Sequence, residues 1–132
     1  MTLQIGDTFT TTKEVTDELV RKFADVSGDF NPLHLDDEFA SKTRFGRRIA
    51  HGMLGASFIS AVLGWELRDY KVVYLSQTLK FTAPVFLGDT VTAKATVREI
   101  RDDKPVVTID TTCENQNGET VITGEAKIMI LP

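Results

Sequence analysis

The chain has 132 residues, enough for one domain with a single hydrophobic core but too few for a cofactor domain beside a substrate domain. Apolar residues make up 42% and charged residues 26%, which is typical of a folded globular protein and excludes a disordered chain. The net charge of −4 argues against a nucleic-acid partner, because nucleic-acid binders usually carry a basic excess on one face.

The first predicted elements are a strand at residues 8–15 and a helix that follows it. Thr16 or Asp17 can cap the N-terminus of this helix. Apolar side chains then recur at helical spacing, namely Leu19, Val20, Phe23, Ala24 and Val26. We expect Gly28 to end the helix, because glycine readily adopts the left-handed conformation that closes many helices.

A long irregular segment, residues 29–50, follows, with one short helical turn predicted at residues 36–41. Pro32 disfavours a regular helix and biases Asn31 toward an extended conformation, so a rigid turn should join Asp29 to His34. Segments of this length inside a compact domain are usually functional or disordered.

An apolar helix is predicted at residues 52–67, with apolar residues on nearly every side, as in a helix surrounded by other structure. Its most apolar part, residues 52–65, is shorter than the roughly 20 residues that span a bilayer. The first residues lack the pattern of a secretory signal, and Cys113 is the single cysteine, so no intrachain disulfide or cysteine-based zinc site is possible. We therefore expect a cytoplasmic protein with no membrane partner.

The second half of the chain shows the alternation of antiparallel strands that have one face on a core. The alternating residues are Val73, Leu75, Leu79 and Phe81, then Val91, Ala93, Ala95 and Val97, then Val107, Ile109, Thr111 and Cys113, and finally Ile122, Gly124, Ala126, Ile128 and Ile130. Residues 116–118, Gln-Asn-Gly, are a strong hairpin turn signal. We predict a single α+β domain over residues 1–132, in which a curved antiparallel sheet of about five strands wraps around one long central helix.

Asp29 and His34 are the candidate catalytic pair. A carboxylate and an imidazole on opposite sides of a water molecule can act as paired acid and base, since histidine titrates near neutral pH. Asn31 can orient either Asp29 or the water through hydrogen bonds. Each residue also has an ordinary explanation, because aspartate commonly forms turns and histidine commonly lies on the surface or in a satisfied hydrogen bond.

Gly52 stands where the apolar helix begins. A free N–H at a helix N-terminus is suited to bind a carbonyl oxygen that becomes enolate-like, although Gly52 can equally serve close packing alone. His51 is interpreted as structural or pocket-lining. The spacing of His34, Asp36 and His51 matches no zinc pattern, so we predict no metal site.

The run Gly28-Asp29-Phe30-Asn31-Pro32-Leu33-His34 resembles the hydratase-2 signature of (R)-specific enoyl-CoA hydratases and MaoC-like dehydratases. The resemblance continues in order through Phe45-Gly46, Ile49-Ala50-His51-Gly52-Met53, Phe81, Pro84-Val85 and Gly88-Asp89. It implies the hotdog fold with an overhanging loop–helix segment, and a homodimer whose active-site tunnel lies near the interface. It also implies that Asp29 and His34 are catalytic and that Gly52 supplies the oxyanion-stabilising N–H.

The implied activity is that of a hydro-lyase, the reversible (3R)-specific hydration of trans-2-enoyl-CoA to (3R)-3-hydroxyacyl-CoA. Asp29 is expected to activate the water and His34 to assist it and relay the proton, but the motif does not fix this division. No metal or redox cofactor is expected, because coenzyme A is part of the substrate. Residues on the inner helix are expected to bind the acyl chain, with ordinary helix packing as the alternative; they are Ser57, Ser60 and Leu63.

Rival functions keep the fold. A (3R)-hydroxyacyl dehydratase of fatty-acid synthesis would use the same residues on an acyl carrier protein, and a non-catalytic acyl-thioester-binding subunit would have lost the activity. A hotdog thioesterase is disfavoured, because the Asp-x-Asn-Pro-x-His arrangement belongs to the hydratase pattern. A basic cluster would suit either coenzyme A phosphates or an acidic carrier, with a solvated loop as the alternative; it comprises Lys42, Arg44, Arg47 and Arg48.

Overall fold

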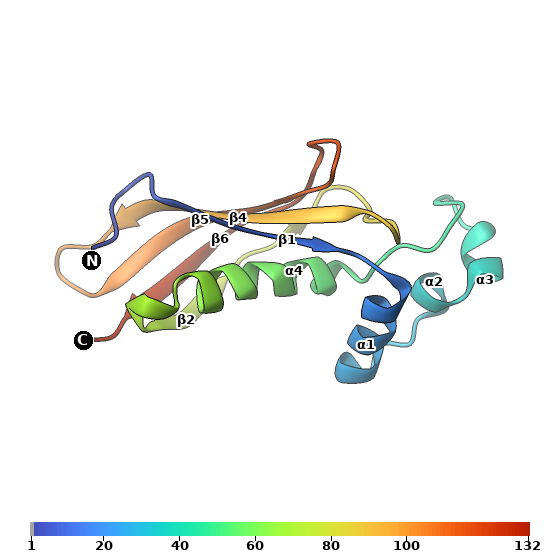
Figure 1. Cartoon of the computed structure of the whole chain (residues 1–132), viewed down its shortest axis with the longest axis horizontal. Coiled ribbons are helices and arrows are strands. Elements are labelled where there is room, and N and C mark those ends of the chain that lie inside the picture. The colour runs from blue at the N-terminus through green and yellow to red at the C-terminus, as the bar shows by residue number, and fades with distance from the viewer. Residues whose placement is uncertain (1) are drawn as a thin grey trace.

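The computed structural model describes residues 2–132, in which an antiparallel sheet forms one layer and the helix α4 (Gly52–Ala61) lies along one face of it (Figure 1). The strands are β1 (Thr8–Glu14), β2 (Val72–Gln77), β3 (Lys80–Phe81), β4 (Thr90–Ile100), β5 (Val106–Glu114) and β6 (Thr120–Ile130). The other helices are α1 (Asp17–Ser27), α2 (Pro32–Leu35) and α3 (Asp37–Ser41), which project beyond one end of the sheet. A π-helical turn, η1 (Val62–Glu66), and a 3₁₀ turn, η2 (Arg68–Tyr70), follow α4.

The sheet has the strand order β1-β4-β5-β6-β2, and the short β3 also pairs with β6. All of these pairs are antiparallel. The predicted α+β hotdog arrangement is confirmed, with six strands rather than about five. The extra strand arises because the chain breaks its pairing between β2 and β3, where the Thr78 carbonyl passes so close to Gly124 that a Cβ there would lie 2.0 Å from its oxygen.

The alternating residues of the strands form the core, because successive side chains on a strand point to opposite faces. On β4, for example, Val91, Ala93, Ala95 and Val97 are all buried, as are Leu54, Phe58 and Ile59 of α4. Cys113 on β5 belongs to the same core, and burial raises the pKa of its thiol to about 12. It therefore behaves as a small apolar side chain.

Helix α1 has the predicted caps. The Thr16 hydroxyl accepts a hydrogen bond from the Leu19 N–H at 3.1 Å, which satisfies one of the free donors of the first turn. Gly28 ends the helix with a φ of 81°, in the left-handed region that favours glycine.

Residues 28–50, called the overhang below, contain a helix that the sequence interpretation excluded. Pro32 was expected to prevent regular helix, yet it is the first residue of α2. At that position proline lacks only an N–H that would have no partner inside the helix. The Asn31 side chain caps the same turn by accepting from the Leu33 N–H at 3.0 Å. The short turn expected at residues 36–41 is confirmed as α3, capped by Asp36.

Helix α4 is not covered on every side, and that prediction is wrong for the single chain. Met53 is 55% exposed, Ser57 and Ser60 are also exposed, and Trp65 on the following η1 is 64% exposed. The helical stretch does continue through the π-helical turn as far as Glu66, close to the predicted end. Within residues 2–132, no helix is both long enough and apolar enough to cross a membrane.

Candidate active site

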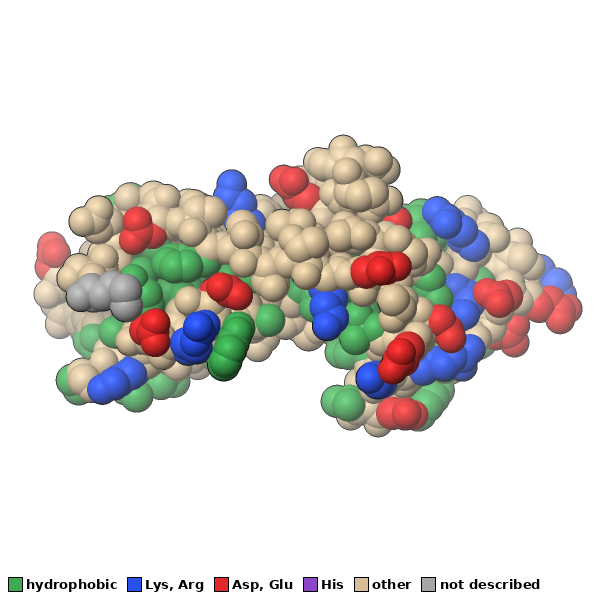
Figure 2. Space-filling model, viewed as in Figure 1, with side chains coloured by type: hydrophobic (Ala, Val, Ile, Leu, Met, Phe, Trp, Pro, Cys, Tyr) green, Lys and Arg blue, Asp and Glu red, His purple; other side chains and the backbone are tan. Residues whose placement is uncertain are grey.

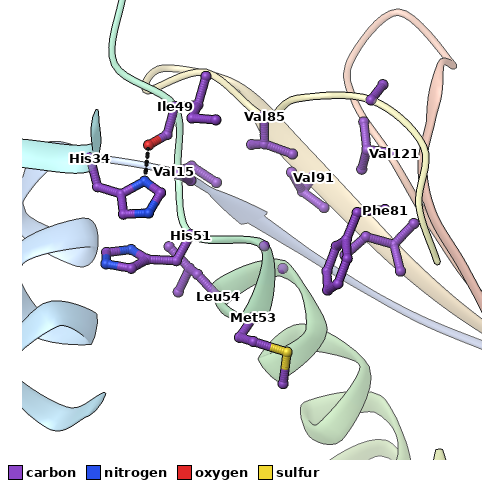
Figure 3. A pocket seen from close by; sticks show the side chains of 15 residues that line it. Val15, His34, Ile49, His51, Met53, Leu54, Phe81, Val85, Val91 and Val121 are labelled. Atoms are coloured by element: carbon purple, nitrogen blue, oxygen red, sulfur yellow. Dashed lines mark hydrogen bonds between the residues drawn. The ribbon is translucent and has the colours of Figure 1, made fainter. Parts of the chain in front are cut away.

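A cavity of about 360 Å³ lies at the N-terminal end of α4 (Figure 3). Most of its wall is apolar, contributed by α4, by β4 and β6, and by the loop after β3. The lining residues are Val15, His34, Ile49, Ala50, His51, Gly52, Met53, Leu54, Gly55, Phe81, Ala83, Val85, Val91, Val121 and Ile122. Such a cavity, apolar with few polar groups at one side, suits an organic substrate that has one reactive polar end.

His34 reaches this cavity from α2 and is only 8% exposed. Its Nδ1 lies 2.8 Å from the Ile49 carbonyl oxygen, and a carbonyl can only accept, so Nδ1 carries the proton and Nε2 is left as an acceptor. Burial lowers the pKa of His34. The hydrogen bond to Ile49 opposes this shift, the charge of His51 adds to it, and the charge of Asp29 opposes it. The imidazole is therefore held mainly in its neutral form at neutral pH.

The structure brings Asp29 and His34 together. A carboxylate oxygen of Asp29, a nitrogen of His34 and a nitrogen of His51 all lie within 4.8 Å of one another. Asp29 is exposed in the single chain, but its Oδ1 accepts a hydrogen bond from the Asn31 N–H at 3.1 Å, which restrains the carboxylate. Asn31 thus acts on Asp29 through its main chain, while its side-chain oxygen caps α2.

His51 lines the cavity beside the pair. Its ring packs on the ring of His34, with centroids 4.0 Å apart and planes 32° from parallel. Its Nε2 lies 3.0 Å from the main-chain oxygen of Asp29. Figure 3 shows the two imidazoles one against the other at the end of the cavity.

Gly52 is the first residue of α4, where N–H groups have no partner within the helix. A Cβ at this position would lie 2.8 Å from the ring of Phe81. Close packing against Phe81 is therefore one reason for glycine here. The position also leaves the amide beside the cavity, where a substrate oxygen can approach it.

The three residues predicted to bind the acyl chain do not line this cavity within the single chain. Ser57 and Ser60 are exposed, and the Ser57 hydroxyl donates to the Leu54 carbonyl. Leu63 is completely buried. Met53, Val85 and Val121 line the cavity instead, and sequence reasoning missed them as site residues, because apolar alternation cannot distinguish a cavity wall from the core.

Arg48 does not belong to a free basic cluster, and that interpretation is wrong. Its side chain is only 8% exposed, Nε donates to the His34 carbonyl at 2.7 Å, and Nη2 donates to Asp17 at 2.5 Å. The hydrogen bond from Arg48 is the main cause that lowers the pKa of Asp17, with Arg21 next. Arg48 therefore ties α1 to the residue that carries the candidate imidazole.

The rest of the cluster has surface partners. Lys42 pairs with Glu38 at 3.3 Å, and the guanidinium groups of Arg44 and Arg47 lie over the rings of Phe45 and Phe86. Figure 2 shows charged side chains of both signs gathered over this end of the molecule.

The group Asp29, His34 and His51 is the one cluster of potential metal ligands within residues 2–132. Asp36, which the sequence analysis weighed with the two histidines as a metal ligand and rejected, caps α3. The two imidazoles pack face against face, and each already bonds a main-chain oxygen through one nitrogen. One nitrogen of each ring is thus already engaged, which leaves one nitrogen of each ring and the Asp29 carboxylate for any further partner.

Comparisons with known proteins agree with the geometry. The family model described as MaoC like domain matches residues 2–118. Over 128 residues the chain is 44% identical to an (R)-specific enoyl-CoA hydratase of Aeromonas caviae, covering 97% of this chain and 96% of that protein. It is 43% identical to a 3-hydroxybutyryl-CoA dehydratase of Methylorubrum extorquens, covering 97% of this chain and 81% of that one.

A relative named for an acyl-carrier-protein substrate has a lower sequence identity to this chain. The chain is 35% identical to a mitochondrial 3-hydroxyacyl-[acyl-carrier-protein] dehydratase of Arabidopsis thaliana, covering 97% and 78% of the two chains. Among solved structures, the (R)-hydratase from A. caviae involved in PHA biosynthesis superposes with a TM-score of 0.94 at 44% identity, over 98% of both chains. Sequence and fold therefore point to the same set of relatives.

Proposed function

The chain belongs to the MaoC-like family, and from this premise we propose that it is an (R)-specific enoyl-CoA hydratase. It is a hydro-lyase that adds water to trans-2-enoyl-CoA, reversibly, to give (3R)-3-hydroxyacyl-CoA. The observation that carries the proposal is the approach of the Asp29 carboxylate to the His34 imidazole, within 4.8 Å, beside an apolar cavity and the first amide of α4.

In the proposed mechanism one water molecule lies between the Asp29 carboxylate and Nε2 of His34. The Gly52 N–H donates to the thioester oxygen and so stabilises the enolate that forms when the water oxygen bonds to C3. The water gives its proton to the pair, with Asp29 as the activating group and His34 as its assistant, and the pair returns a proton to C2. Because the water supplies both the hydroxyl and the proton, the reaction needs no redox cofactor and no metal.

We propose that the acyl chain runs along the open face of α4 past Ser57 and Ser60, whereas Leu63, which is completely buried on η1, is no longer proposed to contact it. Ser57 and Ser60 lie on the open face of α4 in the single chain. A tunnel along this face needs a second surface to close it. The acyl-binding role of these residues therefore depends on assembly.

We propose that the second surface is another copy of the chain, in a homodimer. Strand β2 is an edge of the sheet, and its Val73, Tyr74 and Leu75 are 39% to 46% exposed. Unpaired N–H and C=O groups at such an edge can pair with a second strand, and the apolar side chains would be buried with it. Light scattering tests this: a solution mass near 14.7 kDa, that of one chain, would contradict the dimer.

The decisive experiment measures hydration of trans-2-enoyl-CoAs of increasing length, in EDTA-treated buffer, by the loss of enoyl absorbance. We expect Asp29→Asn and His34→Ala to lower kcat by roughly 10² to 10⁴, the usual contribution of acid–base groups. The exposed Asp29 should be replaced with little change in melting temperature, and His34→Ala, which removes a buried ring, should have a lower melting temperature but remain folded at the assay temperature. Asp25→Asn, which changes an exposed carboxylate on α1, is the matched control and should keep its activity. Full activity in both site variants would end the proposal, and chiral analysis of the product tests the (3R) assignment.

Coenzyme A is favoured over an acyl carrier protein as the carrier. The relatives named for CoA thioesters are 44% and 43% identical to this chain, whereas the carrier-protein dehydratase is 35% identical. Rates on crotonyl-CoA and on the crotonyl carrier protein compare the two directly. A non-catalytic thioester-binding subunit would instead bind crotonyl-CoA and leave its absorbance unchanged.

We also propose that the protein works in the cytoplasm. Cys113 is the single cysteine and is buried in the core, so the chain carries no sign of an oxidising compartment. Fractionation of cells that express the tagged protein tests the location, and recovery with the membrane or the secreted fraction would contradict it.

A further inference from the structure

His51 contacts both members of the proposed catalytic pair without belonging to it. Its ring packs on the ring of His34 at 4.0 Å, and its Nε2 bonds the main-chain oxygen of Asp29 at 3.0 Å. It is also the residue directly before Gly52. All three groups of the proposed mechanism are therefore one contact or one peptide bond away from His51.

The hydrogen bond to Asp29 determines which nitrogen of His51 carries the proton. A carbonyl oxygen only accepts, so Nε2 must donate. His51 is 3% exposed, and its Nδ1 has no hydrogen-bond partner within residues 2–132. A proton on Nδ1 would thus be buried without an acceptor, which is costly. The geometry selects the tautomer with hydrogen on Nε2.

The side chain of His51 serves the overhang rather than its own helix. His51 is the N-terminal cap residue of α4, yet it makes no side-chain capping bond there. Its ring instead lies between elements, 4.9 Å from the ring of Phe23 on α1 as well as against His34 on α2. The N-terminus of α4 therefore lacks a side-chain capping bond, and the His51 side chain instead contacts residues of the overhang.

We infer that His51 is a positioning residue, which holds the Asp29 main chain and the His34 ring at fixed places relative to the Gly52 amide. The inference rests on the proposed hydration, and it assigns His51 no contact with the reacting atoms. The bond to Asp29 and the packing on His34 each link the overhang to the N-terminus of α4. Removing the bond should disturb turnover more than substrate binding, because misplacement of reacting groups raises the barrier.

The first test uses the unaltered protein. The chain has only two histidines, so nitrogen-15 NMR of the imidazoles resolves two sets of signals. The set that disappears in His51→Gln belongs to His51. We expect this ring to carry hydrogen on Nε2 at neutral pH. Hydrogen on Nδ1 instead would overturn the inference, whatever the enzyme assays give.

The second test separates the hydrogen bond from the ring. His51→Gln keeps an amide donor near the place of Nε2, whereas His51→Phe keeps a stacked ring without a donor. We expect kcat to fall about 10- to 100-fold in His51→Phe with KM changed less than about twofold, and to fall less than about threefold in His51→Gln. Undiminished kcat in His51→Phe would overturn the inference. The inference would also be overturned if both variants lost the same fraction of kcat and the same number of degrees in melting temperature. A purely structural role of His51 predicts that result.

The two failures can be told apart. If the unaltered protein hydrates no enoyl-CoA, the proposed function fails, while the tautomer of His51 still reports on the geometry. If the unaltered protein is active and His51→Phe is equally active, the proposed function stands and the positioning role fails. If His51→Phe does not fold, the kcat of His51→Gln and the tautomer of His51 in the unaltered protein test the positioning role.

Discussion

Two regions of the molecule, the overhang and the body formed by the sheet and α4, are each stabilised by a different kind of interaction. The body buries large aliphatic side chains from α4, from η1 and from the strands β4, β5 and β6, including Ile59, Leu63, Ile109 and Ile128 at 1% exposure or less. Among its hydrophobic residues, the overhang fully buries only Ala40 and Ala50, and it depends on helix caps and on bonds from buried polar groups. Burial is non-directional, whereas hydrogen bonds fix orientation.

This difference matters for the chemistry, because the two regions supply different parts of the site. The overhang provides Asp29 and His34, and α4 provides the Gly52 amide. The parts are joined by the bond from His51, the residue directly before α4, to Asp29, and by the hydrogen bond that the Ala50 N–H donates to the Val85 carbonyl at 2.7 Å. The bonds from His34 to Ile49 and from Arg48 to His34 lie within the overhang and fix its shape. Substitutions in the body should therefore lower stability before activity, and substitutions in the overhang should do the reverse.

The largest expected change in stability comes from the body. Ile59→Ala removes a fully buried side chain of α4 and should lower the free energy of unfolding by about 2 to 5 kcal/mol, with kcat of the folded protein almost unchanged. Urea denaturation measures the first quantity, and an assay at low temperature measures the second. Glu66→Ala, at the exposed last residue of η1, is the control and should change neither quantity. A large loss of kcat in folded Ile59→Ala would contradict the expectation that substitutions in the body lower stability before activity.

An intermediate effect is expected at the link between α1 and α2. Arg48→Met leaves the His34 carbonyl and Asp17 without a buried donor, at a cost of about 1 to 3 kcal/mol, and it should also lower kcat by loosening His34. Arg21→Met is the matched control, since Arg21 also bonds Asp17 but is exposed and should cost less than about 1 kcal/mol. Equal kcat values in the two variants would show that Arg48 only stabilises the fold.

The smallest effect concerns pH. Burial is the main cause that holds the pKa of His34 below its ordinary value of 6.5, so the unfolded chain takes up this proton more readily than the folded one. The contribution of His34 to stability is thus complete above about pH 6.5 and is lost as the pH falls below it toward the folded pKa. His34→Gln should show a smaller drop in melting temperature than the unaltered protein between about pH 7 and pH 5. Parallel curves for the two proteins would contradict the shift.

Much of the fold could be predicted because its signals are local. The cap at Thr16, the stop at Gly28 and the alternation along β4 each depend on neighbours a few residues away. The closeness of Asp29 to His34 was anticipated for the same reason, since a five-residue separation with a proline limits the possible turns. The helix at Pro32 was missed because the rule against proline inside helices was applied at a helix start, where it does not hold.

Gly52 at the start of α4 and His51 beside the cavity were also anticipated, but the long-range contacts of the site could not be predicted, because they join residues far apart in the chain. Arg48 meets Asp17 across 31 positions, and His51 meets Asp29 across 22. Nothing in the spacing of these residues distinguishes a buried guanidinium from a solvated one, or a stacked imidazole from a surface one. The openness of the α4 face at Ser57 and Ser60 likewise depends on what packs beside the helix.

The sequence alone determined most of the secondary structure, the apolar layer between sheet and helix, and the carboxylate–imidazole pair, since each follows from short-range sterics, capping and alternation. Only the tertiary structure decided which polar groups are buried, how the overhang is tied to α4 and which edge of the sheet stays open. The physical reason is that the burial of one group depends on every element that packs against it, and residues near it in the chain supply only part of that surface.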